Sequence, residues 1–235
     1  MDPYITHTGR AMPLRRVGVG TDQIIPAARV LREDAAGLAD SLFAAWREDR
    51  QFVLNQSAYA GATILVAGPG FGIGPSRLEA ARALADYGFR AMISARFGDT
   101  LYNDMIQAGI VPAQLPANVV DQLMQTIETD PQIPIAIDLG RREVSTGGEP
   151  CGVFEIDECV RQRLMTGRDA LADLLQAAQR SLVARDLATD QRARLQRRLV
   201  AICDAMKAPG ADMAHGSRRL EEFLGELGRA DGNGA

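Results

Sequence analysis

The chain of 235 residues is long enough for one substantial hydrophobic core and a second small unit. Its net charge of −4 argues against a nucleic-acid binder, which would usually carry a basic surface. The N-terminal residues show no basic segment followed by an apolar stretch, and no apolar run approaches the ~20 residues that a bilayer requires, so we expect a cytoplasmic protein.

Extended and helical patterns alternate in the first half of the chain. Strands are predicted over Pro13–Val19, Ala62–Ala67 and Phe89–Ala95. The second of these is a continuous apolar run, which is typical of a buried parallel strand. Helices are predicted over Ala35–Arg47, Leu78–Tyr87 and Asp99–Gln107. This alternation indicates an α/β domain.

The next segments continue the mixed pattern as far as residue 157. Extended structure is expected on both sides of Pro112, and Ala117–Thr129 has the apolar spacing of a helix. A hairpin is predicted from Ile133–Leu139 and Glu143–Ser145, and a last strand from Gly152–Ile156.

Beyond Asp157 the chain is rich in strong helix formers. Helices are predicted over Cys159–Met165, Leu171–Asp186, Asp190–Met206 and Ser217–Leu227. They are expected to form a helical hairpin that packs on the first domain or on a second copy, or alternatively to dock onto a large partner. The arginines between 192 and 198 are interpreted as a solvated face, not as an RNA-binding patch. Residues 231–235 are expected to be disordered.

A glycine-rich segment, Gly68 to Arg77, separates the predicted strand Ala62–Ala67 from the following helix. A strand, a glycine-rich turn and a helix N-terminus in this order favour an anion site, because free backbone N–H groups and the helix dipole point at one place. The glycine spacing does not fit a dinucleotide fingerprint, and no Gly-Lys-Ser/Thr follows. The alternative is a tight turn without a ligand, in which Pro75 is the first helical residue.

The cysteines and histidines do not form a recognisable metal motif. Cys151, Cys159 and Cys203 are widely spaced and include no Cys-x-x-Cys pair, so we do not expect this chain to hold an iron–sulfur cluster by itself. His7 and His215 are the only histidines, which makes a histidine-rich metal site improbable.

Nine short motifs of this chain resemble, in order and spacing, those of the small subunit of 3-isopropylmalate dehydratase, the swivel domain of the aconitase superfamily. The motifs are His7-Thr8-Gly9, Pro13 to Arg16, Thr21 to Pro26, Leu42 to Arg47, Phe52 to Asn55, Leu65 to Pro69, Ala85 to Arg90, Arg96 to Asp99 and Phe154 to Asp157. The resemblance implies an α/β swivel domain over 1–168, with a mixed, β-barrel-like sheet flanked by helices. Residues 169–230 would then be an α-helical C-terminal extension.

The resemblance also implies a hydro-lyase that isomerises 2-isopropylmalate, or a related 2-alkylmalate, by dehydration and rehydration, as in leucine biosynthesis. In such enzymes a large subunit carries a [4Fe-4S] cluster, and the small subunit joins it in a heterodimer or heterotetramer. The implied ligand of this chain is therefore a small dicarboxylic acid, with no cofactor or metal of its own.

The glycine-rich segment departs from the family pattern at the position of the catalytic base. The family's loop normally contains two serines followed by arginine, and the first serine is the alkoxide base. Here Pro75 replaces that serine, and a proline has neither a hydroxyl nor an N–H. Ser76 is the nearby hydroxyl nominated as base, although adjacent helical positions point about 100° apart. Further departures are Gly20, Gly70, Leu78 and Glu79.

The resemblance assigns the substrate-binding residues as well. Arg77 would bind a substrate carboxylate, together with the backbone amides of Gly72, Gly74 and Ser76. Thr21 and Asp22 would also contact the substrate. In the family their motif has an aspartate directly before the threonine, and here Gly20 replaces that aspartate. Val30 and Leu31 would meet the branched alkyl group, whereas the nearby charges of Arg29 and Glu33 are interpreted as an ion pair on a solvated helix. The alternative function is a catalytically degenerate paralogue that acts as a carboxylate-binding, regulatory or assembly subunit.

Overall fold

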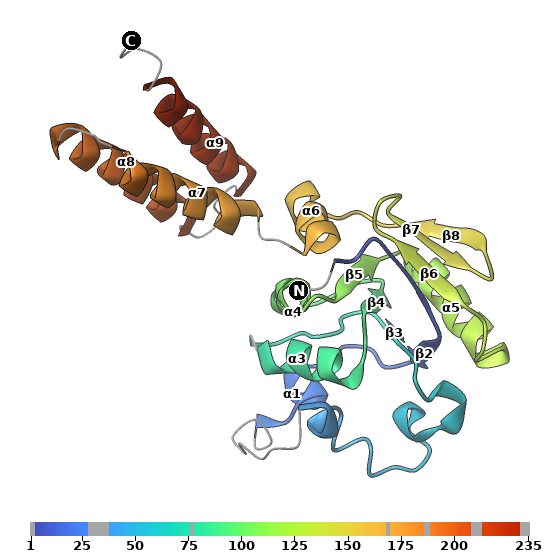
Figure 1. Cartoon of the computed structure of the whole chain (residues 1–235). Coiled ribbons are helices and arrows are strands. Elements are labelled where there is room, and N and C mark those ends of the chain that lie inside the picture. Colours follow the sequence, from blue (N-terminus) through green and yellow to red (C-terminus); the bar gives the residue numbers. More distant parts are fainter. Residues whose placement is uncertain are drawn as a thin grey trace. The chain divides into compact units, whose positions relative to one another are not determined.

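The computed structural model describes residues 3–27, 38–75, 78–167, 170–185, 189–207 and 213–230. The chain divides into two compact units, Met1–Gly167 and Arg168–Ala235. Figure 1 labels most of their helices and strands. Within the described ranges, every helix is too short or too polar to cross a lipid bilayer.

Four parallel strands form the core sheet of the first unit (Figure 1). In spatial order they are β2 (Ala11–Leu14), β3 (Ile64–Ala67), β4 (Ala91–Ser94) and β5 (Val111–Gln114). All residues of the first three strands are buried, as their uninterrupted apolar runs predict. Pro112 is tolerated because β5 lies at the edge of the sheet, where a missing backbone donor costs no ladder bond on the outer side.

Each of the last three parallel strands leads into a helix. These helices are α3 (Leu78–Tyr87), α4 (Asp99–Gln107) and α5 (Ala117–Thr129). In parallel strands the carboxyl ends meet at one edge, so the segments after Leu14, Ala67 and Ser94 are brought together there.

A second sheet of the first unit is antiparallel. Its order is β1 (Thr6–Gly9), β6 (Ile135–Asp138), β7 (Glu143–Thr146) and β8 (Glu149–Val153). In β6 buried and half-buried residues alternate, as expected for a strand with one face on the core. The predicted hairpin is confirmed by the β6–β7 pairing, and the parallel sheet, antiparallel sheet and helices together confirm the α/β class.

Three predicted elements differ from the structure, and one is the last strand expected over Gly152–Ile156, because β8 spans Glu149–Val153 and no strand continues to Ile156. The helix expected over Ala35–Arg47 is wrong: residues 35–37 lie outside the described ranges, Leu38–Ser41 is a short 3-10 helix, and turns follow. Phe43 interrupts any helix with φ of 51°, and its buried ring stacks on Trp46 at a centroid distance of 5.2 Å. The strand expected over Pro13–Val19 ends at Leu14, because the chain turns at Gly18, where φ is 65°.

Short helices complete the first unit. They are α1 (Thr21–Ile24), two 3-10 helices (Val53–Asn55 and Ser57–Tyr59) and α6 (Glu158–Thr166). The carboxylate of Asp157 caps α6 by accepting hydrogen bonds from the N–H groups of Cys159 (2.9 Å) and Val160 (3.2 Å).

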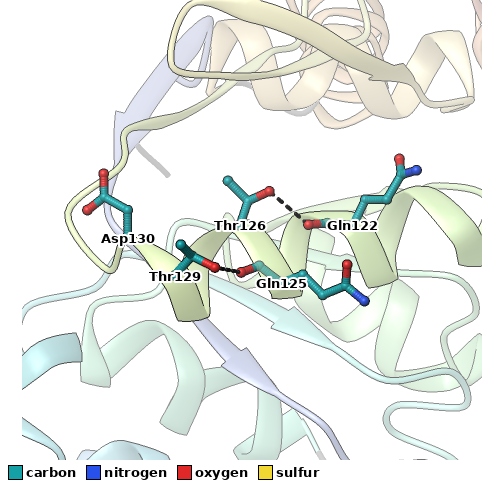
Figure 2. A pocket seen from close by; sticks show the side chains of 5 residues that line it. All are labelled: Gln122, Gln125, Thr126, Thr129 and Asp130. Atoms are coloured by element: carbon teal, nitrogen blue, oxygen red, sulfur yellow. Dashed lines mark hydrogen bonds between the residues drawn. The ribbon is translucent and has the colours of Figure 1, made fainter.

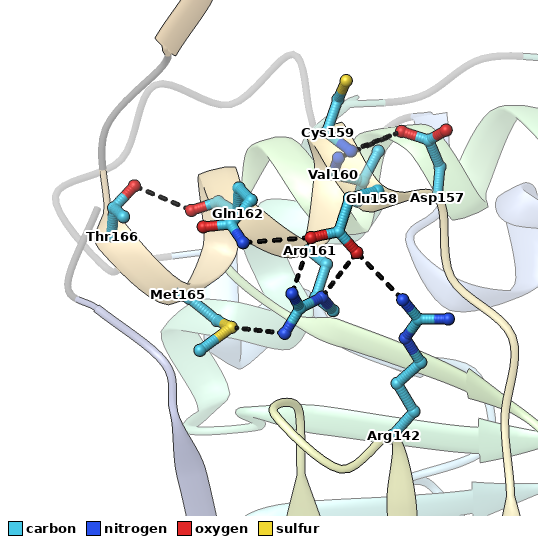
Figure 3. Close-up of polar contacts among 9 residues, drawn as sticks. All are labelled: Arg142, Asp157, Glu158, Cys159, Val160, Arg161, Gln162, Met165 and Thr166. Carbon is cyan, nitrogen blue, oxygen red and sulfur yellow. Dashed lines mark hydrogen bonds and ion pairs between the residues drawn. The ribbon is translucent and has the colours of Figure 1, made fainter.

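Figure 3 shows a polar network that joins α6 to the β6–β7 turn. Glu158 accepts hydrogen bonds from Arg142 (2.9 Å) and from Arg161 (2.6 and 2.8 Å). The Arg161 and Gln162 side chains, with the Arg142 charge, lower the pKa of Glu158 to about 2. Since the Glu158 carboxylate in both ion pairs is exposed, we regard the network as a link between elements and not as a large source of stability.

The second unit contains three helices among its described residues, α7 (Ala170–Ala184), α8 (Thr189–Lys207) and α9 (Met213–Ala230). They bury an apolar core of their own, which consists of Ala178, Leu182, Leu199, Ile202, Leu220, Phe223 and Leu227. The helix predictions in this region are confirmed. Its assignment as an extension of a swivel domain stays a prediction, and the tail 231–235 lies outside the described residues.

Replacing Phe223 by alanine tests the separate core of the second unit. Phe223 is fully buried, so the truncation is expected to destabilise the helices by about 3–5 kcal/mol. Circular dichroism during thermal unfolding should show an earlier loss of part of the helical signal, with the remaining transition unchanged. Val183→Ala, at a position 80% exposed, is the matched control. A single transition that shifts as a whole in Phe223→Ala would contradict separate cores.

His7 gives the first unit a defined pH response. Its Nε2 atom lies 2.7 Å from Oγ1 of Thr63, and burial, followed by the nearby charge of Arg90, lowers the pKa of His7 below 6.5. The neutral imidazole is therefore favoured by folding, and its contribution to stability is present above pH 6.5 and lost as the pH falls below it. Between about pH 7.5 and about pH 5.5, the free energy of unfolding should fall more in the wild type than in His7→Gln. Equal losses in urea unfolding would contradict this role.

Candidate functional site

The glycine-rich loop, residues 68–75, lies at the carboxyl edge of the parallel sheet. It leaves β3 and runs between the segment that follows β2 and the segment that follows β4. Two isolated parallel bridges mark this position, Gly20 with Ile73 and Phe71 with Phe97. The loop is thus the central one of three neighbouring connections.

The segment after β4 supports one side of the loop. The N–H groups of Gly70 and Phe71 donate to the carbonyl of Arg96 at 2.8 and 3.2 Å. The N–H of Gly98 donates back to the carbonyl of Phe71 at 2.8 Å. Buried Ser94 completes this support, because its hydroxyl lies 2.9 Å from the carbonyl oxygen of Gly68 and 3.1 Å from that of Arg96.

The segment after β2 supports the other side. Both Gly72 and Ile73 donate their N–H groups to the carbonyl of Val19, at 2.7 and 3.1 Å. The N–H of Thr21 donates to the carbonyl of Ile73 at 3.0 Å, and the Thr21 hydroxyl donates to the carbonyl of Pro75 at 3.0 Å. The loop conformation is therefore fixed by hydrogen bonds from two chain segments.

These bonds correct the expectation that the loop presents a row of free amides. The N–H of Gly72 is already used by Val19, so it is not available to an anion. Thr21 is 1% exposed and its hydroxyl holds the loop, so its role is structural and not ligand contact. Within the described part of the loop, the N–H of Gly74 has no acceptor, and Gly74 is exposed. Among the described loop amides, the anion-binding prediction is therefore narrowed to that of Gly74, and the Ser76 amide, which lies outside the described residues, stays a prediction.

Gly72 has a packing role that no other residue type can fill. Its φ is 80°, and a Cβ atom at this position would lie 2.6 Å from Cβ of Leu101 and closer still to the end of that side chain. A Cβ on Gly98 would in turn lie 2.6 Å from the carbonyl carbon of Gly72. Glycine at both positions allows the loop to approach α4 and the segment after β4.

Two exposed residues, Asp22 and Pro75, lie beside and at the end of the loop. Asp22 is exposed, and its Oδ1 atom lies 2.5 Å from where a Cβ on Gly20 would be, so the Asp22 carboxylate occupies the space beside the glycine. Pro75 is exposed at the end of the loop and offers only its carbonyl, which Thr21 already uses. Val30, Leu31, Ser76 and Arg77, like Arg29 and Glu33, lie outside the described residues.

Arg96 is a cation of this edge that the sequence interpretation did not single out. Its carbonyl anchors the loop, while its side chain is exposed and makes no ion pair with any residue that the structure describes. The signal was present in the sequence, since Arg96 directly follows a buried strand and lies in the Arg96-Phe97-Gly98-Asp99 motif. An arginine at this edge favours a carboxylate ligand.

Two surface hollows of the first unit contain no residue of the glycine-rich loop. Figure 2 shows one of about 530 Å³ on α5, lined by Gln122, Gln125, Thr126, Thr129 and Asp130. Its threonine hydroxyls donate to carbonyls of their own helix at 2.9 Å, so they have no need of a ligand. A second hollow, of about 460 Å³, includes Arg15, which is already bound to Glu128 by two hydrogen bonds of 2.6 and 3.0 Å.

The described residues also offer no metal centre as an alternative site. Within the described ranges, no three His, Cys, Asp or Glu side chains come close enough together to hold a metal ion. Cys151 is half-buried in β8, Cys159 is exposed on α6, and Cys203 belongs to the second unit. These thiols do not fit the three-thiolate donor set that an aconitase-type cluster requires.

Sequence comparisons place the chain among known proteins. Residues 1–118 match the aconitase C-terminal domain family. The 3-isopropylmalate dehydratase small subunit of Acidothermus cellulolyticus is 51% identical over 178 residues, which cover 76% of this chain and 90% of the relative. The corresponding small subunit of Salinispora tropica is 47% identical over 169 residues, which cover 72% and 86%.

A solved structure agrees with the fold. The 3-isopropylmalate dehydratase structure from Methanocaldococcus jannaschii matches with a TM-score of 0.51 at 24% identity, covering 69% of this chain and 89% of that one. The fold expected from the resemblance, an aconitase-type small subunit, is thereby confirmed. The two small subunits are 51% and 47% identical to this chain over 90% and 86% of their own lengths. The chain therefore belongs to the family of 3-isopropylmalate dehydratase small subunits.

Proposed function

We propose that this chain is the small subunit of a 3-isopropylmalate dehydratase-like hydro-lyase of leucine biosynthesis, working in the cytoplasm. The observation that carries the proposal is the identity of 51% with a small subunit of that name over 90% of its length. The reaction removes a hydroxyl and a proton from adjacent carbons of 2-isopropylmalate and adds them back in exchanged positions. The substrate is thus a dicarboxylate with a branched alkyl group.

The carboxyl edge of the parallel sheet suits one end of such a substrate. The exposed Gly74 amide donates to no other described group, and the Arg96 side chain is an exposed cation of the neighbouring segment. Arg77, which the resemblance assigns to a substrate carboxylate, follows the loop by two residues. We assign these three residues to a carboxylate of the acid, because guanidinium groups and a backbone N–H bind that group well.

The proposed assembly requires a large subunit, in a heterodimer or heterotetramer. The cysteines of this chain do not fit an iron–sulfur cluster, so we place the [4Fe-4S] cluster in the large subunit, where it would act as a Lewis acid. The contribution of this chain is then to bind and orient the acid and to cover the reacting carbons. Ser76 is the nominated proton base, and Pro75 is unable to serve because it has no hydroxyl.

Co-expression with the large subunit tests the proposal. The two chains should purify together. After anaerobic cluster reconstitution, the complex should form the alkene intermediate from 2-isopropylmalate, which is measured by the absorbance of the alkene. Malonate, a dicarboxylate without the alkyl group or the hydroxyl, should compete with the substrate but not react. A chain that neither co-purifies nor supports alkene formation would overturn the proposal.

The second candidate is a degenerate small subunit that binds a carboxylate without supporting turnover. Pro75 favours it, because loss of a general base typically costs about 10²–10⁴-fold in rate. Such a complex would assemble and bind 2-isopropylmalate in calorimetry but form no alkene. The two candidates therefore share the binding step and differ in the chemical step.

A further inference from the structure

Ile73 is an exposed apolar side chain in a loop that otherwise offers little side chain to a ligand. It is 46% exposed, whereas Phe71 beside it is fully buried and the residues at 70, 72 and 74 are glycines. Apart from Pro69 and Pro75, no other exposed residue of the loop has a side chain. Isolated exposed apolar residues are common and need no explanation, so the position of Ile73 must carry the argument.

The N–H and the carbonyl of Ile73 are both bonded to the segment after β2. Its N–H donates to the carbonyl of Val19 at 3.1 Å, and its carbonyl accepts from the N–H of Thr21 at 3.0 Å. The bridge with Gly20 extends this pairing. Since the Cα–Cβ direction follows from the backbone, these bonds fix the point from which the side chain extends beside the loop.

Two glycines lie near the Ile73 side chain. A Cβ on Gly18 would lie 3.8 Å from Cδ1 of Ile73, and a Cβ on Gly70 would lie 3.9 Å from its Cγ2. Neither glycine has a side chain that could cover the isoleucine, which is 46% exposed. The next residue along the chain is Gly74, whose N–H has no acceptor within the described residues.

We propose that Ile73 is a specificity-determining residue, whose side chain contacts the branched alkyl group of the substrate. The inference rests on the proposed function, in which the Gly74 amide binds a carboxylate. In a 2-alkylmalate one of the two carboxylates is attached to the same carbon as the alkyl group, and we assign that carboxylate to Gly74, which brings the alkyl group close to the adjacent residue. Ile73 then adds to the contacts that the resemblance assigns to Val30 and Leu31.

The preference for a larger alkyl group tests this assignment. The complex with the large subunit is assayed with 2-isopropylmalate and with 2-methylmalate, in which a methyl replaces the isopropyl group. Ile73→Ala should lower the ratio of the two kcat/KM values about tenfold, since one or a few methylene contacts change discrimination by that order. Ile73→Val should retain most of the ratio. Ile5→Ala, at an isoleucine 59% exposed outside the loop, should leave it unchanged.

Calorimetric binding of both acids to the same complexes keeps the test independent of turnover. A smaller preference for 2-isopropylmalate in Ile73→Ala, in rate or in affinity, supports the inference. An equal loss for both acids overturns it while leaving the proposed function intact, because Ile73 would then serve packing or subunit contact. A wild-type complex that binds neither acid overturns the proposed function, and the inference with it.

Discussion

Replacing Pro75 by serine is expected to raise kcat of the assembled enzyme by about 10²–10⁴-fold, the usual contribution of a positioned general base. The resemblance places the family's alkoxide base at this position, and the wild-type chain has no hydroxyl there. Alkene formation from 2-isopropylmalate, measured in the complex with the large subunit, gives the rate. KM should change little, because the carboxylate contacts proposed for Gly74 and Arg96 are retained.

The control variant Pro75→Ala separates the effect of the new hydroxyl in Pro75→Ser from the effect of losing the ring. Pro75→Ala removes the ring without adding a hydroxyl, so its rate should stay near that of the wild type. The Pro75 carbonyl accepts from Thr21, and both variants keep that acceptor. In the wild-type background, Ser76→Ala should reduce the residual rate if Ser76 is the base, and an unchanged rate would remove it from that role. Equal rates in Pro75→Ser and Pro75→Ala would contradict the assignment of position 75.

Replacing Gly72 by alanine is expected to destabilise the first unit by about 3 kcal/mol, from the left-handed backbone and from overpacking together. The backbone φ of 80° disfavours an L side chain, and the added Cβ would overlap with Leu101 on α4. Relief of that overlap requires the loop to move away from α4, so the bonds from Gly72 and Ile73 to Val19 should also weaken. Urea unfolding measures the loss, and binding of 2-isopropylmalate should decrease in parallel.

Gly148→Ala is the matched control for the left-handed conformation. Gly148 has φ of 94°, but a Cβ at this position meets no atom within 4 Å. Its substitution should therefore cost only the backbone strain, about 1–2 kcal/mol. Equal losses in Gly72→Ala and Gly148→Ala would show that the approach to Leu101 is unimportant.

Elements with a clear period or an uninterrupted apolar run were predictable from the sequence. The helix α5 has the predicted bounds Ala117–Thr129, because its buried residues recur at helical spacing. The strand β3 lies within the predicted run Ala62–Ala67. The segment around Phe43 was not predictable, because its conformation depends on contacts with distant residues, among them the bond from the Phe43 N–H to the carbonyl of Ile24 (2.8 Å).

The candidate site shows the same division. The sequence identified the glycine-rich loop, since a strand, glycines and a helix follow one another directly. It did not reveal which loop amides donate hydrogen bonds within the protein. Their acceptors, the carbonyls of Val19 and Arg96, lie more than twenty residues away in the sequence. The structural role of Thr21 was hidden for the same reason. Hydrogen-bond partners that are distant in sequence are set by tertiary structure alone.

The hydrogen bonds that hold residues 68–75 to both neighbouring segments have a consequence for ligand affinity. A flexible loop loses conformational entropy when it closes on a small molecule, and this loss weakens binding. Here the backbone order is already established by folding, through the carbonyls of Val19 and Arg96. A small acid that meets this part of the loop therefore finds a preorganised surface, and most of its interaction energy there is retained as affinity.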